Sequence, residues 1–345
     1  MYEIAINKLF RDTSKIGFWD SENNRIHSKL EHDGNWNWVV SSDSTDRYGV
    51  FAISLILAAK LLYDIDLKNY QRKILSYIKY INVNVFNWPK STITYGAFNA
   101  LVFSRILYND KSLDNSINYC IDYIMQKIKV IIDNHDSLFL MGLSSYLKHI
   151  ESRDDVFHYQ NHVVNDLLSC QTENGYFMTG DIRAFHHQRT MYTLWGLCFA
   201  SQQYNNEIIK KSIEKSLKYV WGFRRDVKDN AFLWHPKFYY VKKRSGIIIP
   251  VFIPKSSKYL YECHQTFFAN AIKMYKYFFK SNKYDNEKNA SLNWIFGENR
   301  MGVDLRKVTG IDLPARIMTI DGNFIVPKNK FKGSYEVGSY VFALA

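Results

Sequence analysis

Proline is scarce in this sequence, with only six among 345 residues. Because proline breaks helices and the interior of sheets, its scarcity favours a chain built mainly of helices. No stretch rich in proline, glycine and serine divides the chain, so we expect a single domain over residues 1–345. Apolar residues make up 47% of the sequence, which is enough for a substantial core.

Cysteines and long apolar runs are also few. The apolar run from Val50 to Leu62 is shorter than the ~20 residues of a membrane span. The N-terminal segment lacks the basic and apolar regions of a signal peptide. The four cysteines lie within helical patterns without C-x-x-C spacing, which favours reduced thiols: Cys120, Cys170, Cys198 and Cys263. We therefore expect a soluble, cytoplasmic protein.

Several functional motifs are absent as well. The sequence contains no P-loop, no G-x-G-x-x-G and no G-x-S-x-G, so nucleotide-dependent and serine-hydrolase chemistry find no support, and no cofactor is expected. The net charge of +12 fits either a lysine-rich surface or attraction to a polyanion. No nucleic-acid-binding signature is present, so nucleic acid is not an expected partner.

Six short polar clusters are each followed at once by a helix that is apolar almost all round. Such a helix must be covered on both sides, which places it in an inner layer. The clusters lie at 44–48, 91–95, 134–137, 186–189, 261–265 and 334–336. The predicted inner helices span 47–63, 93–108, 135–150, 187–203, 262–279 and 335–345.

The helices between them have an ordinary two-faced pattern. These predicted outer helices span 2–16, 67–82, 111–132, 153–170, 206–222 and 284–296. Short connections force successive helices to be antiparallel neighbours. The sequence therefore predicts an all-α fold, an (α/α)6 toroid of six inner and six outer helices, with the polar clusters around one mouth.

Two segments interrupt this alternation. Residues 231–260 hold two β-rich runs joined by a basic turn with Lys243 and Arg244, which predicts a β-hairpin flap. Residues 297–334 are rich in glycine and predict a long loop. We expect both segments to roof the mouth, with the basic turn meeting acidic groups of a substrate.

Two stretches resemble known enzymes. Residues 171–177, followed by 186–189 and 192–197, resemble a repeat of α/α-toroid enzymes, found in carbohydrate-active toroids and in the prenyltransferase and squalene-cyclase superfamily. Residues 262–268 and 294–340 look more like the glycan-processing toroids. The resemblance implies a carbohydrate-active enzyme with a glycan as its partner.

Two alternatives within the toroids fit less well. Cys263-His264 resembles the zinc-binding pair of lanthionine cyclases, but Cys198 lacks their surrounding glycines, so no metal is expected. Isoprenoid cyclisation would need an Asp-rich motif, whereas Asp154-Asp155 is isolated on an outer helix.

The leading hypothesis is proton abstraction from a uronic acid, the first step of a polysaccharide lyase or C5-epimerase. This step needs a base, a cation to neutralise the carboxylate, and a tyrosine acid. The candidates are His187 or His264, Arg189 or Arg47, and Tyr192, Tyr95 or Tyr48, respectively.

Glycoside hydrolysis is the alternative, and it would need carboxyl groups at the mouth. The candidates are Asp46, Asp136, Asp181, Glu262 and Glu336, although several of these residues are also common helix N-caps. Sugars could stack on tryptophans near the mouth: Trp36, Trp38, Trp88 and Trp234. A glycan-binding toroid without catalysis is the third possibility. The sequence does not predict the oligomeric state.

The candidate site residues fall into two groups. The proposed catalytic residues are His187, His264, Glu262, Tyr192 and Asp46. The proposed substrate-binding residues are His186, Arg189, Gln188, Arg47, Tyr95, His135, Gln265, Trp36, Trp38, Lys243, Arg244 and Glu336.

Overall fold

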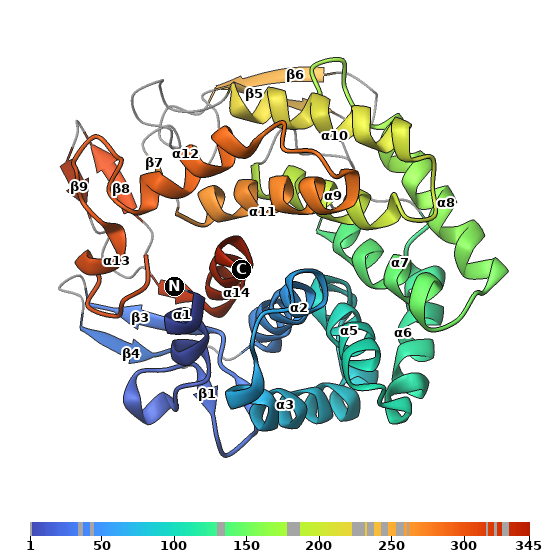
Figure 1. Cartoon of the computed structure of the whole chain (residues 1–345), viewed down its shortest axis with the longest axis horizontal. Helices are drawn as coiled ribbons and strands as arrows, with labels where there is room; N and C mark the ends of the chain where they lie inside the picture. Colours follow the sequence, from blue (N-terminus) through green and yellow to red (C-terminus); the bar gives the residue numbers. More distant parts are fainter. Residues whose placement is uncertain are drawn as a thin grey trace.

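The computed structural model describes residues 2–33, 37–41, 45–129, 135–177, 187–222, 232, 238–242, 248–252, 259–260, 262–314, 317–320, 323–325 and 331–345. An inner ring of helices is surrounded by an outer layer (Figure 1). The inner helices are α2 (Asp46–Tyr63), α5 (Phe98–Tyr108), α7 (Phe139–His149), α9 (His187–Ala200), α11 (Glu262–Phe279) and α14 (Ser334–Leu344). Each packs against the next, and α14 packs against α2 to close the ring.

The outer helices cover the ring from outside. They are α1 (Tyr2–Leu9), α3 (Gln71–Asn84), α6 (Asp114–Lys127), α8 (Asp154–Ser169), α10 (Asn206–Trp221) and α12 (Asp285–Ile295). In α6 the buried residues Ile117, Ile121 and Ile124 recur at helical spacing, so one face meets the ring and the other meets solvent. In α2, by contrast, every residue from Gly49 to Ala59 is buried. The predicted (α/α)6 toroid is confirmed.

Shorter helical segments lie between the main helices: η1 (Thr13–Lys15), η2 (Lys68–Tyr70), η3 (Val85–Asn87), α4 (Lys90–Thr92), the π-helix η4 (Ile93–Ala97), η5 (Lys111–Leu113), η6 (Asp136–Leu138) and α13 (Leu305–Val308). The first helix is shorter than the predicted 2–16. The Asp12 carboxylate accepts a hydrogen bond from the Ser14 amide, and Ile16 adopts a left-handed φ of 55°. These local contacts compete with the helix and end it.

Small sheets connect distant parts of the chain. Strands β1 (Trp19–Asp20) and β2 (Arg25–Ile26) pair with each other, and β3 (Lys29–His32) lies between β4 (Trp38–Val40) and β10 (Phe331–Gly333). Strands β7 (Tyr259–Leu260), β8 (Ile317–Ile320) and β9 (Asn323–Ile325) form another sheet. The prediction of a long loop over 297–334 is therefore wrong in part, because α13 and three strands lie within it.

The predicted hairpin is present. Strands β5 (Phe238–Lys242) and β6 (Ile248–Phe252) are antiparallel, with Lys242 opposite Ile248. Its turn, which contains Lys243 and Arg244, lies outside the described residues. Figure 1 draws the two strands at the margin beside α10. That the hairpin roofs the mouth stays a prediction.

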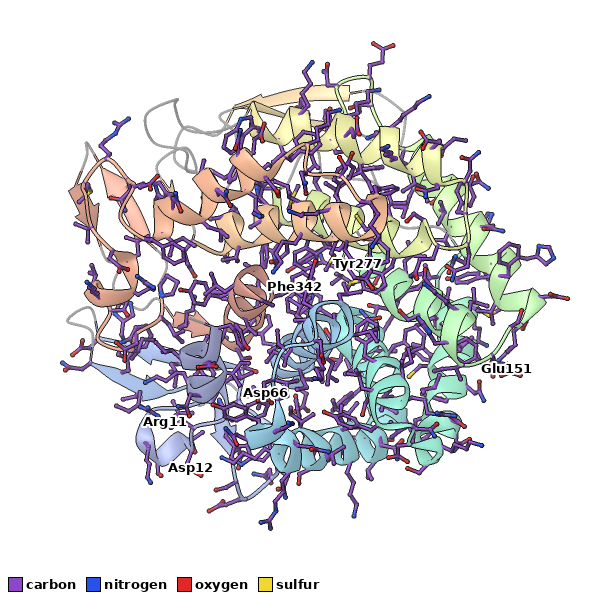
Figure 2. All side chains as sticks on the ribbon, viewed as in Figure 1. Arg11, Asp12, Asp66, Glu151, Tyr277 and Phe342 are labelled. Carbon is purple, nitrogen blue, oxygen red and sulfur yellow. The ribbon has the colours of Figure 1, made fainter. Side chains whose placement is uncertain are left out.

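Side chains fill the interior of the ring. Figure 2 shows Tyr277 and Phe342 near its centre, and Arg11, Asp12 and Glu151 at the periphery. The inner helices approach closely: a Cβ atom on Gly338 of α14 would lie 2.6 Å from the Ala52 Cα of α2. The four cysteines form no disulfide with one another. Among the described residues, no helix is long and apolar enough to cross a membrane.

Candidate functional site

The N-terminal ends of the inner helices meet in a cluster of buried phenols. Tyr95 on η4 and Tyr192 on α9 are 97 positions apart, yet their hydroxyl oxygens lie 2.9 Å apart. Gln188, one turn before Tyr192, donates a hydrogen bond to the Tyr192 hydroxyl. Burial raises the pKa of both tyrosines, so both stay neutral near neutral pH.

Two further predicted residues complete this cluster. The Arg47 guanidinium lies 4.4 Å from the centroid of the Tyr95 ring, and Phe51 stacks on that ring at 4.5 Å. The His135 ring lies 5.7 Å from the Tyr95 ring and 5.4 Å from the Tyr192 ring. The ends of α2, η4, η6 and α9 therefore converge, as the predicted common mouth requires.

The two candidate histidines are brought together. His187 begins α9 and His264 lies in the first turn of α11, and their rings stack with centroids 4.5 Å apart at 19°. Both side chains are buried, and Phe232 packs against His187 at 4.8 Å. Phe267 joins this pair to the phenol cluster, since its ring lies 6.4 Å from His264 and 5.4 Å from Tyr192.

A buried lysine holds the two candidate glutamates. The Lys332 Nζ lies 2.6 Å from Glu262 Oε1 and 3.6 Å from Glu336 Oε2, and all three side chains are at most 1% exposed. Burial disfavours the ammonium, but the two carboxylates outweigh it and raise the pKa of Lys332. Glu336 also accepts hydrogen bonds from the Gly333 amide and the Tyr335 hydroxyl.

Glu262, Glu336 and Cys263 offer ligand atoms within 4.8 Å of one another, a separation that suits a metal ion. The Lys332 ammonium already supplies a positive charge between the two carboxylates. The neighbouring Cys263 thiol is buried too. We therefore interpret this group as a charge-compensated structural cluster.

Asp136 is a further carboxylate at the described mouth. It lies in η6, before α7, and is 4% exposed. Lys90 of α4 pairs with one carboxylate oxygen at 2.8 Å, and the Thr94 hydroxyl donates to the other at 3.0 Å. The preceding residue is His135, so Asp136 lies at the edge of the phenol cluster.

Three predicted residues have hydrogen-bond partners outside the phenol cluster. Asp46 lies 3.4 Å from Arg25 and accepts a hydrogen bond from Tyr80 of the outer helix α3. Ser291 of α12 donates to the Gln265 side chain. The Trp38 indole donates to the Thr309 carbonyl at 2.8 Å, which anchors β4 beside α13. Arg189 lies in the first turn of α9.

Several predicted residues lie outside the described residues: His186, Trp36, Lys243, Arg244, Asp181 and Trp234. Three further residues of these clusters were not predicted from the sequence, namely Lys90, Thr94 and Lys332. Spacing could have indicated Lys90 and Thr94, which are four positions apart and lie one helical turn from each other. Lys332 lies on strand β10, and no local pattern links it to Glu262.

Comparisons with known proteins give a fold match. No protein-family model matches the sequence, and no curated protein matches it significantly. An unsaturated glucuronyl hydrolase from Bacillus sp. GL1, described as responsible for the degradation of glycosaminoglycan, has a TM-score of 0.64 at 12% identity. The match covers 100% of this chain and 96% of that one.

Two other solved structures give the same picture. An unsaturated glucuronyl hydrolase specific for heparin has a TM-score of 0.66 at 8% identity, covering 99% of this chain and 94% of that one. A glycosyl hydrolase family 88 protein from Bacteroides vulgatus has a TM-score of 0.60 at 9% identity, covering 99% and 97%. The resemblance to toroidal carbohydrate-active enzymes is thus confirmed at the level of the fold.

Proposed function

We propose that this protein is a glycoside hydrolase that acts on oligosaccharides containing a uronic acid. The similar structures are of unsaturated glucuronyl hydrolases and match almost the whole chain. One of them was solved with dGlcA-Glc-Rha-Glc bound to an Asp-to-Asn variant. Fold alone does not fix function, so the proposal also needs a suitable group at the mouth.

The position of Asp136 at the mouth is the observation that carries the proposal. Hydrolysis needs a carboxyl group that can transfer a proton to or from the sugar or water. Glu262 and Glu336 are poorer candidates, because they and their lysine partner, Lys332, are at most 1% exposed, whereas the Lys90 side chain that pairs with Asp136 is 40% exposed. Asp136 follows His135, whose ring lies 5.7 Å from that of Tyr95 and 5.4 Å from that of Tyr192, where the ends of the inner helices converge.

The named substrate class of the similar enzymes makes one carboxyl group sufficient. An unsaturated uronic acid carries a ring double bond next to the ring oxygen, so it is an enol ether. Protonation of the double bond gives a cation that the ring oxygen stabilises, and water then adds to it to give a hemiketal. The hemiketal opens to a ketone and leaves a hemiacetal at the anomeric carbon, which breaks down to an aldehyde and releases the next sugar as an alcohol. Asp136 would donate that proton and take one from the attacking water, while Lys90 and Thr94 hold its carboxylate in place.

The lyase or epimerase chemistry expected from the sequence finds less support. The similar structures are hydrolases, and burial makes Tyr192 a weaker proton donor by raising its pKa. In the proposed hydrolase, His187 and His264 would contact the sugar near the mouth, a role that stays a prediction.

The direct test uses an oligosaccharide with an unsaturated uronic acid at its non-reducing end. A hydrolase should remove the ultraviolet absorbance of the double bond, whereas a lyase acting on a polymer should create it. Asp136→Asn should lower the rate by roughly 100-fold or more. Asp114→Asn is the matched control, because Asp114 also forms an ion pair, with Arg105 at 2.7 Å, but at an outer helix. Equal activity of Asp136→Asn and wild type would contradict the role of Asp136.

A further inference from the structure

One long segment of the chain carries positive charge and no negative charge. Residues 67–109 contain no aspartate or glutamate, although the whole chain has 33 acidic residues. The cations of this segment are Lys68, Arg72, Lys73, Lys79, Lys90 and Arg105. Lys73 donates to a backbone carbonyl, and Lys90 and Arg105 form ion pairs. The other three cations are exposed, and no carboxylate of a described residue lies within ion-pair distance of them.

These three cations lie on one face of the outer helix α3 and the turns that flank it. The segments η2, α3 and η3 form a continuous helical run over 68–87. Exposed long side chains recur along this run at steps of three and four, so they share one side of it. We call this set the α3 stripe: Lys68, Arg72, Leu75, Lys79, Val83 and Phe86. Figure 1 shows α3 at the outer margin of the ring.

Apolar side chains alternate with cations along the α3 stripe. Val83 is 64% exposed, Phe86 is 39% exposed and Leu75 is 37% exposed. Tyr119 of α6 holds Phe86 in place, because its ring lies 4.8 Å from the Phe86 ring and its hydroxyl donates to the Phe86 carbonyl at 3.1 Å. Exposed apolar side chains between cations fit a partner that offers both negative charge and an apolar interior.

The α3 stripe lies on an open surface and not in a groove. A shallow hollow runs along its first half, lined by residues of η2 and α3: Lys68, Gln71, Arg72, Leu75, Ser76 and Lys79. No second element of the described chain forms an opposite wall. A peptide helix typically docks in a groove, whereas a flat partner can rest on one convex helix. A bilayer with anionic head groups is such a partner, because it attracts lysine and arginine and takes apolar side chains below the head groups.

We infer that the α3 stripe is a docking surface for a lipid bilayer with anionic head groups. Lys68, Arg72 and Lys79 contact the head groups, and Val83 and Phe86 enter the layer beneath them. The helix then lies in the plane of the bilayer surface and does not cross it. This inference does not depend on the proposed hydrolase function.

The test is sedimentation of the full chain with vesicles of phosphatidylcholine alone or of phosphatidylcholine mixed with phosphatidylglycerol. Wild type should bind the mixed vesicles more tightly, and added salt should weaken this binding by screening the exposed charges. The triple variant Lys68→Gln, Arg72→Gln, Lys79→Gln should bind them about 100-fold more weakly, since each cation near an anionic surface contributes ~1 kcal/mol, or about fivefold. Val83→Ser should weaken binding roughly threefold without a change of charge. All these side chains are exposed, so the variants should fold.

The matched control removes three lysines from an exposed face of α10, which lies across the ring from α3 in Figure 1. This variant, Lys211→Gln, Lys215→Gln, Lys218→Gln, has the same net charge as the α3 variant but should bind the mixed vesicles nearly as tightly as wild type. An equal loss in both triple variants would reduce the effect to net charge and overturn the docking surface. Wild type that binds the mixed vesicles no better than the neutral ones would also overturn it. In that case, binding of a poly-glutamate peptide through the same cations would identify an acidic peptide as the partner instead.

Discussion

Lys332 and Glu262 form an ion pair of 2.6 Å although 70 positions separate them, and both side chains are only 1% exposed. Lys332 lies on β10, which pairs with β3 near the N-terminus, and Glu262 begins the inner helix α11. The pair therefore connects strand β10, which precedes the last inner helix α14, to α11, the helix next to α14 in the ring. Since Glu262 is two positions before His264, it also fixes the first turn of α11, which carries one of the two stacked histidines.

Removing the lysine should destabilise the protein strongly. Lys332→Met would leave the carboxylates of Glu262 and Glu336 buried without a cation, at a cost of about 3–5 kcal/mol. Urea unfolding at neutral pH measures this loss. The double variant Lys332→Met, Glu262→Gln should recover part of the stability, because it removes one buried charge. A single variant as stable as wild type would show that the pair is not needed.

The same ion pair predicts that the protein loses stability at alkaline pH. The pKa of Lys332 is raised above the ordinary 10.5, so its stabilisation is fully present below that pH. It is lost as the pH rises through the raised pKa of the folded state, because the folded protein then releases the proton that it held more tightly. Wild type should lose stability there more steeply than Lys332→Met, as urea unfolding across that range would show.

Lys273 predicts the opposite dependence. Burial, aided by Lys288, lowers the pKa of Lys273 from 10.5 to about 7, and its ammonium rests on the rings of Tyr63 and Phe342 (Phe342 is labelled in Figure 2). Between these pH values the unfolded chain binds more protons, so stability should rise with pH, by up to ~1.4 kcal/mol per pH unit. Lys273→Met should abolish this rise, whereas Lys211→Met on the exposed face of α10 should retain it. Urea unfolding over this pH range measures the difference.

Close packing of the ring predicts a cost for a single methyl group. A Cβ on Gly338 would lie 2.6 Å from Ala52 Cα and 2.8 Å from the Ala52 carbonyl oxygen, where backbone cannot yield easily. Gly338→Ala should therefore destabilise the protein by about 1–3 kcal/mol, although alanine is the better helix former. Among the described residues, a Cβ on Gly222 would meet the Tyr219 carbonyl at 3.2 Å and the Lys218 carbonyl at 3.8 Å, so Gly222→Ala should change stability far less. Denaturant unfolding compares the two variants directly.

A substitution at the stacked histidines should separate their role in packing from a role in catalysis. His187→Phe keeps an aromatic ring against His264 and Phe232, so the folded state should remain stable. If the imidazole contacts the substrate or transfers a proton, turnover should fall by roughly 100-fold. His149→Gln, at the far end of α7, should retain activity. Full activity of His187→Phe would remove this imidazole from the site.

The sequence predicted the helical layers well because burial leaves a local pattern. Helix α2 is apolar on all sides, and α6 has one apolar face, so the inner and outer layers could be distinguished without coordinates. The polar residues before each inner helix also placed Tyr95, Tyr192, His187 and His264 at a common mouth, where the structure finds them.

The misses have non-local causes. Strands β3 and β10 pair across nearly the whole chain, and strands of three or four residues leave little pattern of their own. The structure also gives individual polar residues partners that a local pattern cannot name. Asp46 forms an ion pair with Arg25, and the Gln265 side chain accepts a hydrogen bond from Ser291 in the outer layer.

By itself, the sequence determined which segments form helices and whether each helix lies in the inner or the outer layer. It also determined the end of each inner helix at which the polar residues lie. Each of these follows from the pattern of apolar and polar residues within a single helix. Only the tertiary structure decided which of those residues touch: Lys332 with Glu262, Asp136 with Lys90, and Arg47 with the face of Tyr95. The physical reason is that hydrogen bonds and ion pairs act over a few ångströms in space. The closing of the ring, and not the order of residues along the chain, sets those distances.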